Sequence, residues 1–144
     1  MLKSNKKNII KNHFDNLSKS RSDWIKKSET FYSEDIRCMK EFIEEGSKVL
    51  EIGCGNGHLL AALKPSYGIG LDISNGMINE AKNKYKNISF LEADVENQKT
   101  INRLDTVFDY IIISDTIGYF NDIQNTLDSL HKVCDSDTRI IVAY

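Results

Sequence analysis

The stretch that decides the fold is Val49-Leu-Glu-Ile-Gly-Cys-Gly-Asn-Gly-His-Leu-Leu60. It joins a short apolar segment, through three glycines, to a run of small and apolar residues. Glycine lacks a Cβ and adopts positive φ at little cost, so a turn of this kind lets the backbone approach a ligand closely. The pattern predicts a strand at 48–52, a ligand-binding loop at 53–57 and a helix from residue 59 onward.

Strand and helix patterns continue to alternate on both sides of this stretch. Ser33, followed by two acidic residues, predicts the start of a helix that stops at Gly46. Strands that alternate with helices pair in parallel through crossover connections. The predicted fold class is therefore α/β, with a doubly wound, mainly parallel sheet of about five strands and helices on both faces. Further strands are expected at 67–71, 88–91, 109–113 and 139–143, with helices at 59–63, 74–84 and 122–134 and a weaker helix or turn at 96–104.

Length and composition limit the class of protein. The chain has 144 residues, of which 40% are hydrophobic and 28% charged, as expected for one globular domain. No apolar run approaches the roughly 18 to 20 residues that span a bilayer, and the N-terminus lacks the apolar segment of a secretory signal. A cytoplasmic location is expected. The three cysteines form no Cys-x-x-Cys pair, so we expect reduced thiols and no metal site.

Charge is distributed unevenly along the chain. The net charge of −2 argues against a general nucleic-acid-binding surface. The first 27 residues, however, hold eight lysines or arginines and two aspartates. We expect residues 1–32 to form a helical arm or lid that packs over one end of the sheet near a ligand, ahead of a ligand-binding domain at 33–144. The basic residues fit either an anionic partner or a solvated helix face.

Spacing and charge in the glycine loop distinguish between ligands. A dinucleotide-binding G-x-G-x-x-G pattern would require a third glycine where this chain has His58. The pattern acid-x-G-x-G-x-G is instead matched without a gap from Glu51 to Gly57. A carboxylate at this strand end would repel a pyrophosphate but suits a ligand with an ammonium and a sulfonium group. S-adenosylmethionine carries both.

In this motif the sequence resembles class I S-adenosylmethionine-dependent methyltransferases, whose fold is a Rossmann-like sheet. The resemblance covers about residues 33–144 and implies methyl transfer from S-adenosylmethionine, leaving S-adenosylhomocysteine, to a small-molecule, sugar or lipid-linked acceptor. The family normally continues after the fifth strand with a helix and an antiparallel hairpin. We therefore expect this chain to be an N-terminal fragment or a truncated form, and its exposed fifth-strand edge to permit a homo-oligomer unless the N-terminal arm shields it.

Further motifs follow on the next strand ends. Asp72 follows Gly53 by 19 residues, near the roughly 20 expected for an acid that accepts ribose hydroxyls. The resemblance implies that Asp94 and Val95 contact the adenine, with Glu92 as the alternative acid. The predicted cofactor-binding residues are Glu51, Gly53, Cys54, Gly55, Asn56, Gly57, Asp72, Ile73, Met77, Asp94, Val95 and Ser114.

Catalytic residues are harder to predict, because the cofactor already carries an activated methyl group. Asp115, in the loop after the fourth strand, is the candidate for a weak base, although a solvated turn explains it as well. The resemblance also implies that N-terminal aromatic residues cover the cofactor, with Trp24, Phe31 and Tyr32 as candidates. Three alternatives stay open: an NAD-dependent oxidoreductase, an aminopropyl transferase, and a non-catalytic cofactor-binding or assembly module. The sequence leaves the acceptor undefined.

Overall fold

The computed structural model describes residues 2–144, with side chains from residue 5 onward. Its centre is one sheet in which all pairings are parallel, in the order β3-β2-β1-β4-β5. The order reverses between β1 and β4, which places the ligand-binding position of such sheets beside the end of β1. The five predicted strands are confirmed: β1 (Lys48–Ile52), β2 (Tyr67–Asp72), β3 (Ser89–Glu92), β4 (Tyr110–Ser114) and β5 (Arg139–Ala143).

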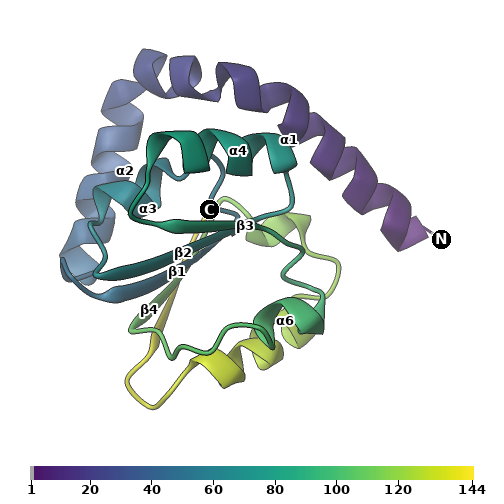
Figure 1. The fold of residues 1–144 in the computed structure, drawn as a ribbon, viewed down its shortest axis with the longest axis vertical. Helices are drawn as coiled ribbons and strands as arrows, with labels where there is room; N and C mark the ends of the chain where they lie inside the picture. Colours follow the sequence, from purple (N-terminus) through teal and green to yellow (C-terminus); the bar gives the residue numbers. More distant parts are fainter. Residues whose placement is uncertain (1) are drawn as a thin grey trace.

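Helices pack on both faces of the sheet, as the alternating pattern predicts (Figure 1). On one face lie α2 (Glu29–Phe42), α3 (His58–Ala62) and α4 (Asn75–Lys84). On the other lie α5 (Gln98–Ile101), α6 (Ile123–Ser129) and the 3-10 turn η2 (Leu130–Val133). A second 3-10 turn, η1 (Ile117–Tyr119), follows β4. The α/β fold class is confirmed, and the described residues include no antiparallel hairpin.

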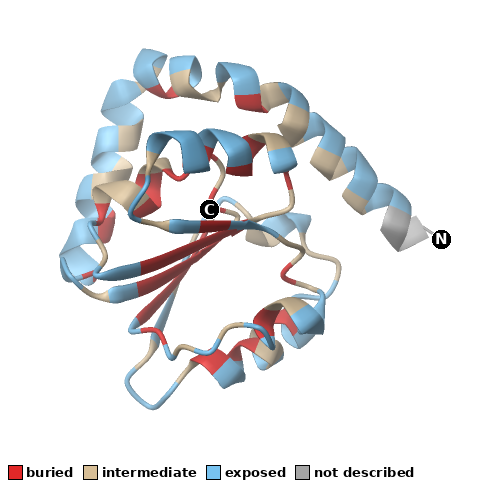
Figure 2. Cartoon of the chain, viewed as in Figure 1, coloured by how far each residue is buried: buried red, intermediate tan, exposed pale blue. Residues whose placement is uncertain are grey.

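The sheet is buried on both faces, because alternate residues of each strand enter different hydrophobic clusters. Val49 of β1 packs with the helices α2 to α4, whereas its neighbour Leu50 packs with α5 and η2. Both side chains are completely buried. Figure 2 shows the buried residues concentrated in the central strands. This rigid core fixes the strand ends and the loops that follow them.

Phe90 of β3 fills space that two glycines leave open. A Cβ on Gly57 would lie 2.6 Å from Cζ of Phe90, and a Cβ on Gly70 would lie 2.7 Å from its Cδ1. Gly70 also faces the Sγ of Cys54, which would be 2.8 Å from an added Cβ. Phe90 is 2% exposed in this position. Glycine at both positions is therefore a packing requirement.

The N-terminal segment differs from the sequence-based prediction. The helix α1 runs over Leu2–Lys27, and α2 begins at Glu29, so a helix start at Ser33 is wrong. Ser33 lies inside α2, where its hydroxyl donates to the Thr30 carbonyl at 2.9 Å instead of capping a helix. Nor does Gly46 stop the helix, which ends at Phe42, while Gly46 adopts a φ of +85° in the following turn. The proposed division of the chain after residue 32 falls within α2.

The helix α1 lies along α4, on the side away from the sheet (Figure 1). Ser18 is 6% exposed at this contact, and a Cβ on Gly76 would lie 2.5 Å from its Oγ. The missing side chain of Gly76 thus allows the close approach of the two helices. Within the described part of the chain, no helix combines the length and the apolar character needed to cross a membrane.

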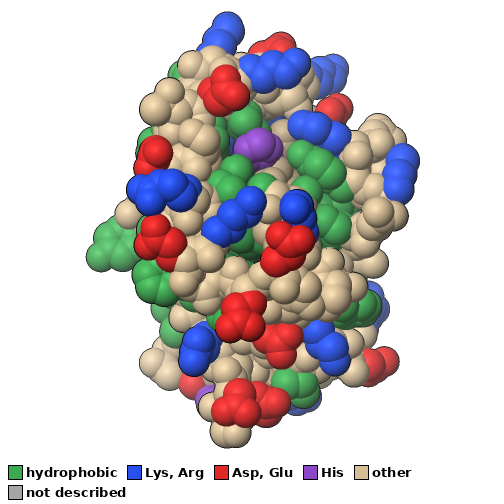
Figure 3. All heavy atoms as spheres, turned by 90° about the vertical axis from the view of Figure 1, so that its left-hand side faces the viewer, with side chains coloured by type: hydrophobic (Ala, Val, Ile, Leu, Met, Phe, Trp, Pro, Cys, Tyr) green, Lys and Arg blue, Asp and Glu red, His purple; other side chains and the backbone are tan. Residues whose placement is uncertain are grey.

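The surface on the side of α2 is mixed in character. Figure 3 shows acidic and basic side chains interspersed over this face, with hydrophobic atoms exposed between them. Phe31 and Phe42 of α2 are 64% and 59% exposed. The side chains of α2 that enter the core are those of Ile36 and Met39.

Candidate cofactor site

A cavity of about 360 Å³ opens at the carboxyl ends of the strands. This is the position and the size expected of a small-molecule site in a parallel sheet. Eleven of the twelve predicted cofactor-binding residues line it, together with Asp115; the exception is Gly57. The eleven are Glu51, Gly53, Cys54, Gly55, Asn56, Asp72, Ile73, Met77, Asp94, Val95 and Ser114.

The three glycines of the loop after β1 all adopt positive φ, at +75°, +53° and +78° for Gly53, Gly55 and Gly57. A Cβ on Gly53 would lie 2.0 Å from Oγ1 of Thr116, whereas a Cβ on Gly55 would meet no atom within 4 Å. Gly57 is the N-cap residue that precedes α3, and it faces Phe90 instead of the cavity. The first glycine brings two loops together, the second leaves the cavity open, and the third serves packing.

Glu51 is a buried acid without a complete set of partners. Its side chain is 3% exposed, and its Oε2 accepts no hydrogen bond from any described residue. Burial raises the pKa of Glu51 well above its ordinary value, and the nearby carboxylates of Asp72 and Asp35 raise it further, while the Leu60 amide opposes the shift. A buried oxygen with no donor is costly. The site therefore lacks a cationic or hydrogen-bond-donating group beside Glu51.

Asp72 joins two loops through its carboxylate. Its Oδ2 accepts the Gly55 amide and its Oδ1 accepts the Ser74 amide, both at 2.8 Å. Burial raises the pKa of Asp72, although these amides partly offset the effect. Each carboxylate oxygen keeps further acceptor capacity. Asp72 is thus able to accept hydroxyl donors from a ligand while it holds the loops.

The structure distinguishes the two acids considered for the loop after β3. Asp94 lines the cavity, and its Oδ1 accepts the Glu96 amide at 3.0 Å. Glu92 lies outside the cavity, where it binds Lys11 and accepts the Asn75 side-chain amide at 2.7 Å. Asp94 is the acid available to a ligand.

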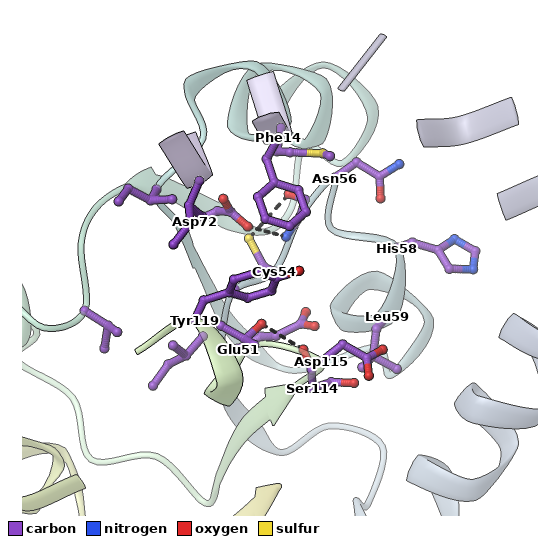
Figure 4. A pocket seen from close by; sticks show the side chains of 18 of the residues that line it. Phe14, Glu51, Cys54, Asn56, His58, Leu59, Asp72, Ser114, Asp115 and Tyr119 are labelled. Atoms are coloured by element: carbon purple, nitrogen blue, oxygen red, sulfur yellow. Dashed lines mark hydrogen bonds between the residues drawn. The ribbon is translucent and has the colours of Figure 1, made fainter. Parts of the chain in front are cut away.

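Two further acids, Asp115 after β4 and Asp35 of α2, lie together in another part of the cavity. Asp115 has a φ of +52°, unusual for a residue other than glycine, and its amide donates to the Ala143 carbonyl at 2.9 Å. Its side chain shares the cavity with Asp35 of α2, whose pKa is raised by burial and then by Asp115. Figure 4 shows Glu51, Ser114 and Asp115 together at one side of the cavity, with Asp72 at the other side beyond Cys54.

Among the cavity-lining residues that sequence reasoning missed, five come from α1, which closes the cavity on the side opposite the loops. Lys7 forms ion pairs with Asp94 and with Glu96, the latter at 2.9 Å. Phe14 packs edge-on against Tyr119, with ring centroids 5.4 Å apart. The cavity-facing residues of α1 follow one another at intervals of three, four or seven residues, and this helical spacing is the sequence signal that identifies the face. The α1 residues that line the cavity are Lys7, Ile10, Phe14, Arg21 and Ile25.

The expectation for the N-terminal aromatic residues holds for one of three. Tyr32 lines the cavity. Trp24 and Phe31 do not, and at 57% and 64% exposure they point to solvent, so that part of the prediction is wrong. Trp24 lies near the end of α1 and Phe31 in the first turn of α2.

Residues 43–144 match the family described as "Methyltransferase domain". The chain belongs to this methyltransferase domain family. Among curated proteins, it is 27% identical to malonyl-[acyl-carrier protein] O-methyltransferase of Priestia megaterium over 133 residues, which are 88% of this chain and 47% of that protein. It is 30% identical to the ubiquinone/menaquinone biosynthesis C-methyltransferase of Campylobacter jejuni over 115 residues, 74% of this chain and 48% of that protein. The chain spans about half the length of these relatives.

Solved methyltransferase structures share the fold. Magnesium protoporphyrin IX methyltransferase from Synechocystis, solved with bound S-adenosylmethionine, has a TM-score of 0.72 at 19% identity, covering 95% of this chain and 74% of its own. A Thermotoga maritima S-adenosylmethionine-dependent methyltransferase, described as a possible histamine N-methyltransferase, has a TM-score of 0.74 at 21% identity, covering 92% and 60%. The Rossmann-like methyltransferase fold predicted from the glycine motif is confirmed.

Proposed function

We propose that this chain binds S-adenosylmethionine in the cavity at the strand ends and forms the cofactor-binding part of a methyltransferase for a small-molecule acceptor. The observation that carries the proposal is the buried Oε2 of Glu51, which faces a glycine loop and has no donor among the described residues. The ammonium and sulfonium groups of this cofactor are the kind of charge that such a carboxylate stabilises.

The acids of the cavity support the same ligand against a dinucleotide. Asp72 lies where either ligand would present ribose hydroxyls, so it does not distinguish them; the distinction comes from Glu51, beside the glycine loop where a dinucleotide would place its pyrophosphate. Asp35 and Asp115 add negative charge on the adjoining side. A diphosphate would be repelled by this set of groups, whereas a ligand with cationic centres would be attracted.

Each residue has a role in holding the reactants. When bound, S-adenosylmethionine supplies an activated methyl group for transfer to a nucleophile. Asp72 is suited to the ribose hydroxyls and Asp94 to the amino group of the adenine, with Ile73 and Met77 as apolar contacts. The helix α1 excludes water from the opposite side through Ile10. Holding donor and acceptor together is the main contribution that methyl transfer requires of the protein.

The acceptor is proposed to enter beside Asp115, at the side of the cavity where β4 ends. The curated relatives are named for a malonyl-[acyl-carrier protein] substrate and for quinone biosynthesis, which supports a small-molecule or carrier-linked acceptor. Asp115 and Asp35 both line the cavity, and we assign them the role of taking up a proton or orienting a hydroxyl group of the acceptor. Product analysis with decarboxylated S-adenosylmethionine would separate methyl transfer from aminopropyl transfer.

Calorimetric titration tests the proposal. We expect S-adenosylmethionine and S-adenosylhomocysteine to bind the 144-residue chain with one site, and NADH to give no binding heat under the same conditions. Chemical-shift changes on cofactor addition should fall on residues 51–57, 72–77 and 94–96. Absence of binding at millimolar cofactor, or shift changes elsewhere on the molecule, would refute the proposed site.

The outer edge of β5 supports a further proposal about partners. In the described residues this edge pairs with no strand, and Ile140 and Val142 are 41% and 40% exposed. An unpaired edge with exposed apolar side chains favours pairing with another chain. We expect the 144-residue chain to self-associate through β5 with increasing concentration. Light scattering that gives the monomer mass throughout would contradict this.

A further inference from the structure

The cavity carries far more negative than positive charge. Only two basic residues of the described chain, Lys7 and Arg21, contribute lysine or arginine side chains to its wall. Lys7 is already paired with Asp94 and Glu96. Arg21 forms no ion pair with any described carboxylate. One cation in the wall of an acidic cavity therefore has its donors free for a ligand. The acids that line the cavity are Asp35, Glu51, Asp72, Asp94, Glu96 and Asp115.

Contacts along α1 place Arg21 at one end of the cavity. Lys7 contacts Asp94, in the loop after β3. Eight residues further along the helix, just over two turns, Asp15 accepts the Ser74 hydroxyl at 2.6 Å and the Gly76 amide at 2.9 Å, in the segment after β2.

Further along the helix, Ser22 accepts the Asn56 side-chain amide at 3.4 Å, in the glycine loop after β1. The helix thus crosses the strand ends in the order β3, β2, β1, over roughly 22 Å at 1.5 Å per residue. Arg21 precedes Ser22 and lies beside the glycine loop, at the opposite end from Asp94. If adenine lies at Asp94 and ribose at Asp72, this end receives the amino-acid part of the cofactor.

The guanidinium group is positioned without being neutralised. Its central carbon lies 5.4 Å from the centroid of the Tyr32 ring, within the range of a cation–π contact. His58 also lines this part of the cavity, and its pKa is lowered first by burial and then by Lys84 and Arg21. A neutral His58 does not compete with Arg21 for an anion. The ring of Tyr32 orients the group while leaving its N–H donors available.

The chemistry of the proposed cofactor matches this arrangement. Its amino-acid part carries an ammonium and a carboxylate on the same carbon atom. Glu51 offers an unpaired carboxylate to the cationic side of the ligand, and the ligand's carboxylate then requires a cation. A planar guanidinium binds a carboxylate through two parallel hydrogen bonds, a geometry that lysine does not provide.

We infer that Arg21 of α1 binds the carboxylate of the cofactor's amino-acid part and so selects ligands that carry this group. The inference rests on the proposed function, because it requires the adenine and ribose positions given above. It also gives α1 a direct part in ligand binding, beyond covering the cavity.

The test pairs two ligands with three forms of the protein. S-adenosylmethionine and its decarboxylated form, which lacks only the carboxylate, are titrated into the wild type, Arg21→Met and Lys19→Met. Lys19 is exposed on the same helix and forms no ion pair with the described residues, so it is the matched control. Losing a charge-assisted bidentate contact should lower the affinity of Arg21→Met for S-adenosylmethionine at least about tenfold. Its affinity for the decarboxylated ligand, and both affinities of Lys19→Met, should change less than about twofold.

Other outcomes overturn the inference in distinguishable ways. Equal losses of Arg21→Met for both ligands would assign Arg21 a structural role in holding α1, and no loss would exclude any contact. Wild type that binds neither ligand would refute the proposed function itself. If Arg21→Met fails to fold in a thermal melt, the wild type alone decides, since equal affinity for the two ligands would contradict a carboxylate contact. Arg21→Lys should fall between wild type and Arg21→Met for S-adenosylmethionine.

Discussion

The two walls of the cavity are held by different forces. The loop wall, formed by the loops at 53–57, 72–76 and 93–96, is fixed by the backbone: the amides of Gly53 and Cys54 donate to the Leu71 carbonyl at 2.7 and 3.0 Å, and the Ala93 amide donates to the Asp72 carbonyl at 2.8 Å. The helix wall, formed by α1, is attached near the cavity by side chains such as Lys7. A backbone-fixed wall presents the ligand with a constant geometry, whereas a side-chain-attached wall is able to separate from it.

The interaction energies also differ between the two walls: ion pairs hold the helix wall, and the buried sheet holds the loop wall. Burial opposes the charge of Lys7, yet its contacts with Asp94 and Glu96 outweigh burial and raise its pKa. Such partly exposed ion pairs nevertheless stabilise a protein by about 1 kcal/mol or less. Breaking the loop wall requires unfolding the sheet, whose central strands are buried on both faces. We therefore expect α1 to open at a lower free energy than the loop wall.

The largest effect is expected where the loop wall is packed most tightly. Gly53→Ala places a Cβ against Thr116 and forces an L-residue to a φ of +75°. Gly55→Ala meets no neighbouring atom, so its cost comes only from holding an L-residue at a φ of +53°. We expect Gly53→Ala to lower the free energy of unfolding by about 2 to 5 kcal/mol, from overpacking plus strain, and Gly55→Ala by about 1 to 2 kcal/mol. Urea denaturation measures both. Equal losses would show that the Thr116 contact relaxes freely.

Asp72→Ala tests the link between the loop wall and the ligand. The change removes two amide–carboxylate hydrogen bonds, each contributing about 1.5 to 3 kcal/mol, as well as the proposed ribose contact. Cofactor affinity should fall at least about tenfold, and the free energy of unfolding should fall as well. Glu80→Ala, on an exposed part of α4, is the control. Unchanged cofactor affinity in folded Asp72→Ala would remove this residue from the site.

Glu51→Gln separates ligand binding from stability. The pKa of Glu51 is raised in the folded chain, so the folded state binds more protons than the unfolded state above the ordinary glutamate value of 4.5. The free energy of unfolding of the wild type should therefore fall as pH rises above 4.5, until the raised pKa is passed. Glu51→Gln removes this dependence and should be more stable at pH 8 by about 1 to 3 kcal/mol, while binding the cofactor more weakly.

Chemical denaturation between pH 5 and pH 9 measures the difference, with Glu80→Gln as the exposed control. Parallel pH profiles for wild type and Glu51→Gln would contradict the buried, unpaired state of this carboxylate.

The smallest effect concerns the helix wall. Raising the salt concentration from about 50 mM to 500 mM screens the partly exposed ion pairs of Lys7 and Lys11, so amide exchange in α1 should accelerate a few-fold. Exchange in β1 should stay unchanged. Lys7→Met should reproduce the acceleration at low salt, with a cost in global stability of about 1 kcal/mol or less. Equal acceleration in α1 and β1 would show that the two walls open together.

The same contrast explains which parts were predictable from the sequence. The strands and the loop wall follow from local patterns: apolar runs, three glycines and acids at the strand ends, whose geometry is fixed within a few residues of each motif. Accordingly, each predicted strand agrees with the structure to within one residue at either end, and Glu51, Asp72 and Asp94 line the cavity. The spacing of the motif predicts a ligand contact for Gly57, but Gly57 faces Phe90 and does not line the cavity.

The helix wall was not predictable in the same detail, because its contacts join residues far apart in the chain. Lys7 meets a partner 87 residues away, and Asp15 meets Ser74 across 59 residues. Nothing near Lys7 in the sequence specifies Asp94 as its partner. A helical arm near the ligand could be inferred from composition, but the register of α1 depends on tertiary contacts. The start of α2 was missed for a related reason, since a serine before two acids fits a helix interior as well as a cap.

Phe90 and the two glycines that accommodate it have a consequence for how sequences of this kind diverge. The ring at position 90 excludes a side chain at position 70, where the Sγ of Cys54 adds a second obstacle, so Gly70 can be replaced at low cost only after both neighbours have become smaller. Position 57 stays glycine for a further reason, because its φ of +78° disfavours any other residue even beside a smaller ring. Homologues with alanine at the position of Gly70 are therefore expected to carry a small aliphatic residue in place of Phe90 and a smaller residue in place of Cys54, so that positions 54, 70 and 90 covary while position 57 does not change.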